Sequence, residues 1–125
     1  MELTPLEAAV LDMLLAGDDP WLAILREQRR LLHVTGREHS GVGFSADLAV
    51  PADAPKLPGG ATVRFGDVSA DIDGLEQGAG FLLFIDGGVI TVLEGYLYGD
   101  AEWPVEVTKF TLRYDREPRD LAPLH

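Results

Sequence analysis

Acidic side chains are concentrated in one stretch of this chain and are the residues best placed to do chemistry. Between Asp67 and Thr108 there are nine carboxylates and no lysine or arginine. The nine are Asp67, Asp71, Asp73, Glu76, Asp86, Glu94, Asp100, Glu102 and Glu106. The same stretch alternates between apolar and polar residues, as a β-sheet does. A sheet that carries charge of one sign projects a field, so this pattern favours a basic protein as the partner.

The segment Glu94–Pro104 combines these acids with aromatic residues. We predict a binding surface made of Glu94, Tyr96, Tyr98, Asp100, Glu102 and Trp103. Such residues recognise a basic partner through ion pairs, stacking and cation–π contacts. Strand alternation places Glu94, Tyr96 and Tyr98 on one face. The alternative is that Trp103 and one tyrosine close the edge of the sheet, while the acids are only solvated.

A second set of titratable residues could serve a small pocket between helices and sheet. His39 beside Glu38 has the make-up of a histidine–carboxylate base, and the Asp71/Asp73 pair offers two carboxylates. Residues 69–74 are similar to the first half of a calcium loop, but the twelfth position is Gly80, where such a loop needs a bidentate glutamate. A catalytic metal usually takes three protein ligands. We therefore assign no catalytic residue and expect neither a metal nor a cofactor.

The composition limits the class of partner and the location. The net charge is −11 over 125 residues, which disfavours nucleic acid because phosphate contacts need clustered lysine and arginine. No apolar run approaches the ~20 residues of a membrane helix, and the first residues lack the basic region of a secretory signal. The absence of cysteine fits a reducing compartment. These features predict a cytoplasmic protein without membrane contact.

Two short helices are predicted at the N-terminal end, at about residues 4–33. Thr4-Pro5-Leu6-Glu7 has the pattern of a capping box, with Thr4 as the N-cap and Pro5 at the first helical position. Asp19 followed by Pro20 predicts the start of the second helix. Both segments carry apolar residues at helical spacing, so each helix should bury one face.

From Val34 onward the apolar period is that of strands. We predict strands at Val34–His39, Val42–Val50, Thr62–Phe65, Val68–Ile72, Gly80–Ile85, Val89–Tyr98 and Val105–Tyr114. The connections are too short for helical crossovers, so the sheet should be mainly antiparallel and meander-like, with the helix pair on one face. The prediction is one α+β domain over residues 1–125, with the sheet at about 34–114 and a flexible tail at 115–125. The proline-rich segment 51–60 is the best candidate for a mobile loop.

Four short motifs are also found together in a group of small bacterial proteins that carry no assigned activity. They are the Thr-Pro-Leu-Glu start, Gly41–Phe44, Asp73–Glu76 and the Glu-Gly-Tyr…Trp-Pro stretch at Glu94–Pro104. The chain resembles this group from Leu3 to Tyr114. The resemblance implies one bacterial domain, and it implies no cofactor and no site.

Two classes of function are compatible with these residues. The first is a non-enzymatic binding protein, immunity-like, whose acidic sheet face masks a basic partner such as a toxin effector. The second is a small ligand-binding domain or enzyme with a pocket between helices and sheet. A homodimer formed through an edge strand is compatible with either class. We prefer the binding protein, because the charge pattern supports it and no catalytic motif supports the second class.

Overall fold

The N-terminal segment forms two helices joined by a short turn. The computed structural model describes residues 2–104 and 106–125, so Met1 and Val105 lie outside it. Helix α1 (Pro5–Leu14) begins with the predicted capping box: the Glu7 N–H donates to Thr4 Oγ1 over 3.1 Å, and the Thr4 N–H donates to Glu7 Oε1 over 2.9 Å. Helix α2 (Pro20–Leu31) begins at Asp19, whose carboxylate accepts from the Trp21 N–H over 2.8 Å. The predicted starts of both helices are confirmed.

The rest of the fold is one antiparallel sheet of seven strands in the described residues. The strands are β1 (His33–His39), β2 (Gly43–Ala49), β3 (Val63–Phe65), β4 (Val68–Ile72), β5 (Ala79–Asp86), β6 (Val89–Leu97) and β7 (Phe110–Tyr114). Their order is β1-β2-β6-β5-β4-β7, and β3 also pairs with β5. The last strand is shorter than predicted, because residues 106–109 are not in a strand. Val105, where that strand was predicted to begin, lies outside the described residues.

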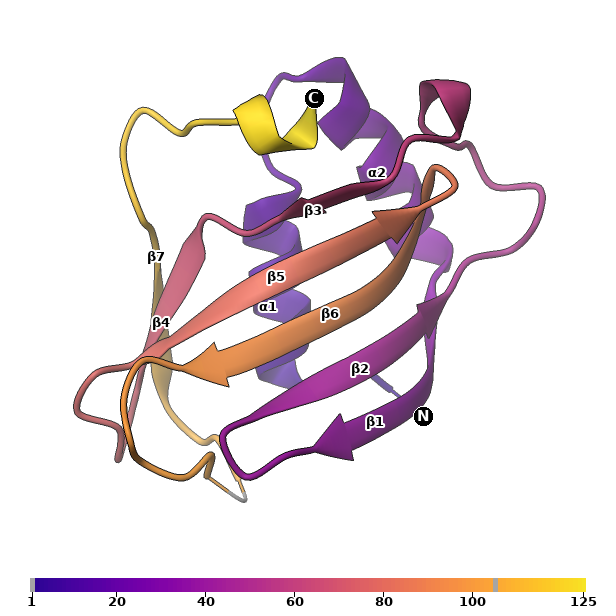
Figure 1. The fold of residues 1–125 in the computed structure, drawn as a ribbon. Coiled ribbons are helices and arrows are strands. Elements are labelled where there is room, and N and C mark those ends of the chain that lie inside the picture. The colour runs from indigo at the N-terminus through magenta and orange to yellow at the C-terminus, as the bar shows by residue number, and fades with distance from the viewer. Residues whose placement is uncertain (1, 105) are drawn as a thin grey trace.

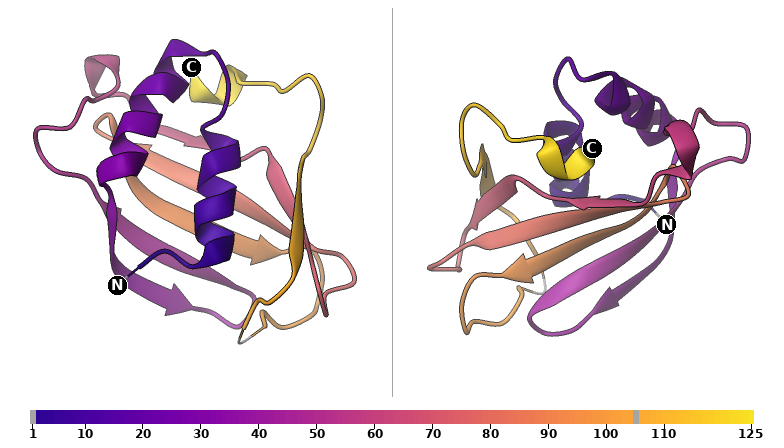
Figure 2. Two further views of the ribbon diagram at one scale, coloured as in Figure 1. Left: turned by 180° about the vertical axis from the view of Figure 1, so that it is seen from behind. Right: turned by 45° about the horizontal axis from the view of Figure 1, so that its top comes forward.

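The helix pair covers one face of the sheet, as Figures 1 and 2 show from opposite sides. Helix α2 lies over β6 and α1 lies near β4. The strand residues that point toward the helices form the core with the buried helix residues. They include Ala46, Ala70, Phe81, Leu83, Ile85, Ile90 and Leu93, all of which are buried. The predicted α+β architecture, with two helices on one face of an antiparallel sheet, is confirmed.

The opposite face of the sheet is not covered by a second layer of described helices or strands (Figure 1). Pairing across the strands places on this side the residues that alternate with the core. We call it the open face and define it by Glu38, Ser45, Asp47, Leu82, Phe84, Val92, Glu94 and Tyr96. Its apolar members Leu82, Phe84 and Val92 are half-buried. This surface therefore presents both apolar and acidic groups to solvent.

The C-terminal segment packs against the helices, although we predicted a flexible tail at 115–125. Arg119 donates to the carbonyl oxygens of Leu14 and Ala16 over 2.9 and 2.6 Å and forms an ion pair with Asp67 at 2.7 Å. Leu124, in the short 3₁₀ helix η2 (Ala122–Leu124), is fully buried. The sequence of this segment, which is charged and contains prolines, did not indicate these contacts. In the structure the guanidinium of Arg119 satisfies carbonyls at the end of α1.

The proline-rich segment 51–60 is also fixed by contacts. Ala54 and Leu57 are buried, and the Leu57 N–H donates to the Gly88 carbonyl over 3.0 Å. Gln28 of α2, which has no exposed surface, joins this segment to the β5–β6 hairpin. Its side-chain amide donates to the carbonyls of Pro55 and Gly88 over 2.7 and 2.9 Å, and its oxygen accepts from the Ile90 N–H over 2.9 Å. The loop is therefore tied to both layers of the fold.

The helices of the described residues are short. None of them combines the length and the apolar character that crossing a membrane requires.

Candidate functional site

Two glutamates and a serine form a row across three neighbouring strands of the open face. Glu38 of β1 is the register partner of Ser45 of β2, and Ser45 is the partner of Glu94 of β6. Because adjacent strands lie about 4.8 Å apart, the Cα atoms of the two glutamates are separated by about 10 Å. The short side chain of Ser45 leaves space between them. This row brings together Glu94 and Glu38, which the sequence analysis assigned to different sites.

The space above this row is a hollow of about 340 Å³. It is lined by Glu38, His39, Ser40, Val42, Gly43, Phe44, Ser45, Glu94, Gly95 and Tyr96. A Cβ atom on Gly43 would collide with the Gly95 carbonyl oxygen, so β2 and β6 approach each other closely at the base of this hollow. We call this feature the acidic hollow and define it by Glu38, Val42, Ser45, Glu94 and Tyr96. Its walls offer two carboxylates, a hydroxyl, an aromatic ring and an aliphatic side chain.

Tyr96 forms the aromatic wall of the acidic hollow. Its side chain is 38% exposed, and its ring lies edge-on to Tyr98 with 5.7 Å between the centroids. Partial burial raises the pKa of Tyr96, and the nearby Tyr98, Asp115 and Glu94 raise this pKa further. The ring is therefore neutral at physiological pH and can offer its face to a cation.

Tyr98 lies beside Tyr96 but is engaged in the structure of the sheet. Its hydroxyl lies 2.6 Å from Ser69 Oγ, and Ser69 also hydrogen-bonds Asp115. Ser69 is 2% exposed, so this network is closed to solvent at the serine. The predicted placement of Tyr98 near Glu94 and Tyr96 agrees with the geometry, but its hydroxyl is already bonded.

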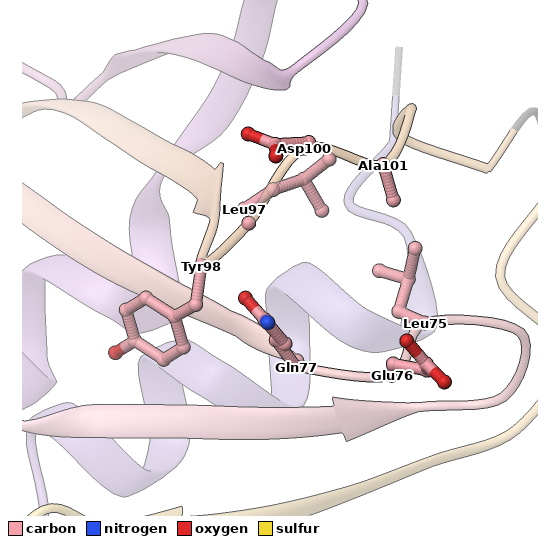
Figure 3. A pocket seen from close by; sticks show the side chains of 9 residues that line it. Leu75, Glu76, Gln77, Leu97, Tyr98, Asp100 and Ala101 are labelled. Atoms are coloured by element: carbon pink, nitrogen blue, oxygen red, sulfur yellow. The ribbon is translucent and has the colours of Figure 1, made fainter.

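Asp100 and Glu102 lie beyond the end of β6, away from the acidic hollow. Asp100 lines a smaller hollow of about 220 Å³, where Leu75, Glu76 and Gln77 approach residues 97–101 (Figure 3). Asp100 lies on one side of it and Glu76 on the other (Figure 3). Glu102 is exposed. The structure therefore does not unite these two acids with Glu94 and Tyr96.

Trp103 lies on the helix side of the sheet. Its ring packs edge-on against the buried Phe44 with 5.2 Å between the centroids, and the backbone N–H of Trp103 donates to the Gly41 carbonyl over 2.7 Å. It lines a third hollow, of about 400 Å³, together with Pro104, Glu106, Val107 and residues at the start of α1 and on β1. Leu6, Glu7, Arg37 and His39 also line this hollow. Trp103 therefore packs against Phe44, next to a cavity that lies between helix and sheet.

Glu7 has a role in this third hollow that its position in the capping box did not reveal. Glu7 is buried, and its carboxylate accepts from Arg37 Nε and Nη2 over 2.8 and 2.7 Å. These hydrogen bonds and the charge of Glu7 raise the pKa of Arg37, although desolvation opposes the shift. The pair joins α1 to β1.

The residues of the predicted alternative pocket are separated. Glu38 points to the open face, whereas the adjacent His39 lies near Phe44, with 6.5 Å between the ring centroids. Asp71 forms an ion pair with Arg113 at 2.8 Å on β4 and β7, at the other edge of the sheet from Glu38. Asp73 follows β4 at that same far edge. Residues 2–104 and 106–125 contain no group of three histidine, cysteine or acidic side chains that could hold a metal ion.

Val42 and Ser45 belong to the acidic hollow but were not among the predicted residues. Val42 is 58% exposed, and alternation within its own segment gives no reason to single it out. Ser45 matters because of its two neighbours across the sheet. Only the order of the strands, which cannot be read from one strand's pattern, would have identified it.

Comparison with known proteins gives no further assignment. No family model matches this chain, and neither the curated proteins nor the solved structures include a significant match to it.

Proposed function

We propose that this chain is a non-enzymatic binding domain whose open face covers a basic surface of a partner protein. The observation that carries the proposal is the row Glu38–Ser45–Glu94, two carboxylates on either side of a hollow in an uncovered sheet. An immunity-like role, in which binding masks a basic effector, is the form of this function that the geometry and the charge support best.

The distribution of charge supports a basic partner over a second copy of this chain. The net charge is −11, and Asp47 adds a third carboxylate to the open face beside Glu38 and Glu94. Two such faces brought together would place like charges in contact, which costs free energy. Two basic residues at this side of the sheet have contacts of their own: Arg64 lies over the Phe84 ring at 4.8 Å, and Arg113 pairs with Asp71.

Affinity capture with two matched double variants tests this proposal. In Glu38→Gln/Glu94→Gln the carboxylates of the acidic hollow are neutralised, and in Glu76→Gln/Glu102→Gln two exposed carboxylates elsewhere are neutralised. Both variants change the net charge equally. A basic protein that the wild type retains at low salt should be released at high salt, lost by the first variant and kept by the second. Equal loss by both variants, or capture that does not depend on salt, would contradict the proposal.

A second candidate function rests on the third hollow. Its volume of about 400 Å³ is in the usual range of small-molecule sites, and the ring of Trp103 and the side chain of His39 line it. We therefore keep the ligand-binding class as the alternative. Because a ligand that binds only the native state raises the melting temperature, a thermal-shift screen against metabolites tests it. A Trp103→Leu variant should lose any such shift, while Glu38→Gln/Glu94→Gln should retain it.

A further inference from the structure

We propose that the acidic hollow is a receptor for a single arginine side chain of the partner. This inference rests on the proposed function and adds the identity of the residue that anchors the partner. Two properties of the acidic hollow favour an arginine: the separation of its carboxylates and the uncharged side chains beside them.

The separation of Glu38 and Glu94 suits a guanidinium better than an ammonium. The two side chains rise from opposite sides of Ser45, about 10 Å apart at their Cα atoms, as the strand spacing requires. A guanidinium is planar and carries donors on more than one edge, so one group can donate to carboxylates on both sides. A lysine ammonium is compact and strongly hydrated, so it would contact one glutamate and leave the other distant. The gap therefore selects for arginine.

The uncharged walls of the acidic hollow match the rest of an arginine side chain. Three large apolar or aromatic side chains stand out as exposed among the described residues, and two of them, Val42 and Tyr96, line this hollow. The Tyr96 ring can stack on a guanidinium plane. Val42 offers apolar surface to the methylene stem of the arginine. Arginine side chains commonly pack this stem against apolar surface while the charged group contacts polar partners. An anion or a purely apolar ligand would leave both glutamates without partners.

Titration of the whole protein with blocked amino acids, followed by NMR, tests this inference directly. The probes are N-acetyl-arginine methylamide, the corresponding lysine compound and the corresponding citrulline compound, which keeps the shape of arginine without its charge. We expect arginine to shift the amide resonances of Ser45 and Gly95, lysine to bind about fivefold more weakly, and citrulline to cause no shift. The Glu38→Gln/Glu94→Gln variant should lose about tenfold in affinity for arginine, and Glu76→Gln/Glu102→Gln should bind as the wild type does.

The outcomes separate this inference from the proposed function. If arginine and lysine bind equally well, the selection for arginine is refuted while a basic partner remains supported. If neither compound shifts Ser45 or Gly95, the acidic hollow is not a receptor for a single side chain, and the inference is overturned. In that case the affinity-capture experiment still decides the proposed function, because it measures the whole open face. A wild-type spectrum for both variants establishes that any lost binding is not caused by unfolding.

Discussion

The hydroxyl oxygens of Tyr98 and Ser69 lie 2.6 Å apart, although β5 runs between β6 and β4. Tyr98 follows the end of β6, and its side chain reaches Ser69 on β4 by passing over Gly80 of β5. A Cβ atom at Gly80 would collide with the Tyr98 hydroxyl and lie 2.7 Å from Cζ of Tyr96. The two tyrosines therefore depend on the absence of a side chain in the strand beneath them.

Gly80→Ala should destabilise the protein by about 1–3 kcal/mol, because the added methyl group displaces both tyrosines from a closely packed site. Tyr98→Phe removes the hydroxyl, so Gly80→Ala should cost less stability in that variant than in the wild type. A double-mutant cycle in urea denaturation measures this coupling. If the two changes are additive, the Tyr98 hydroxyl is not what excludes a side chain at position 80.

Glu7→Gln should lower the free energy of unfolding by about 3 kcal/mol, because it leaves the guanidinium of Arg37 without its charged partner in a largely buried position. Arg37 and Glu7 side chains are only 16% and 2% exposed. Thr4→Ala is the matched control, since it removes the helix cap alone and should cost about 1 kcal/mol. Equal effects of the two variants in urea denaturation would show that the ion pair adds nothing to the cap.

Gln28→Leu should cost about 3 kcal/mol, because the Pro55 carbonyl and the Ile90 N–H lose this partner in the interior and the Gly88 carbonyl keeps only the Leu57 N–H. The same variant should speed hydrogen exchange in segment 51–60 and at the β5–β6 turn, since the side chain joins them. Glu27→Gln, at the exposed neighbouring position, should change stability by less than about 0.5 kcal/mol. Unchanged exchange in segment 51–60 of the leucine variant would mean that the loop is held by other contacts.

Glu94→Lys should slow association with a basic partner more than Glu102→Lys does, although both reversals change the net charge equally. Glu94 lies in the acidic hollow, whereas Glu102 is an exposed residue outside it. Charge reversal at the binding surface lowers the association rate and its dependence on salt. Stopped-flow or surface-binding kinetics with the captured partner measure both. Identical rates for the two variants would place the binding surface elsewhere.

Tyr96 should ionise above the ordinary tyrosine pKa of 10.0, because burial, Tyr98 and the nearby carboxylates disfavour its charged form. The unfolded chain loses this proton first as the pH rises past 10.0, so above that pH the folded state is the more protonated one. The free energy of unfolding should therefore fall with rising pH in this range. The difference between wild-type and Tyr96→Phe tyrosinate absorbance isolates this titration. An ordinary pKa for Tyr96 would mean that the ring is better solvated than the structure indicates.

Local features of this fold could be predicted from the sequence because their partners lie within a few residues. The Thr4–Glu7 capping box and the Asp19 cap satisfy backbone groups in the next turn, and most strand ranges follow from alternation. The helix-on-sheet architecture then follows from the apolar stripes. These assignments depend only on residues that are close to one another in the sequence.

The acidic hollow could not be predicted in the same way. The alternation of side chains predicts which residues of β6 share a face with Glu94. It does not predict that β2 pairs with β6 or that β1 pairs with the other side of β2. Arg37 is 30 residues from Glu7, so the second role of that glutamate has no local signal. Trp103 lies in a connection without periodicity, and its side of the sheet depends on where Phe44 is packed.

The bonds from Arg119 to the end of α1 also bear on how the chain folds as it is synthesised. Helix α1 is made early, yet the carbonyls of Leu14 at its end and of Ala16 just beyond it find their donor 105 and 103 residues later. Until then these oxygens remain bonded to water, and the nascent helix lacks part of what holds it in place. Contacts between such distant segments slow folding, because a large loop must close, at a cost in entropy, before these contacts can form and stabilise the fold. We therefore expect the first helix to reach its final stability only after residue 119 has left the ribosome.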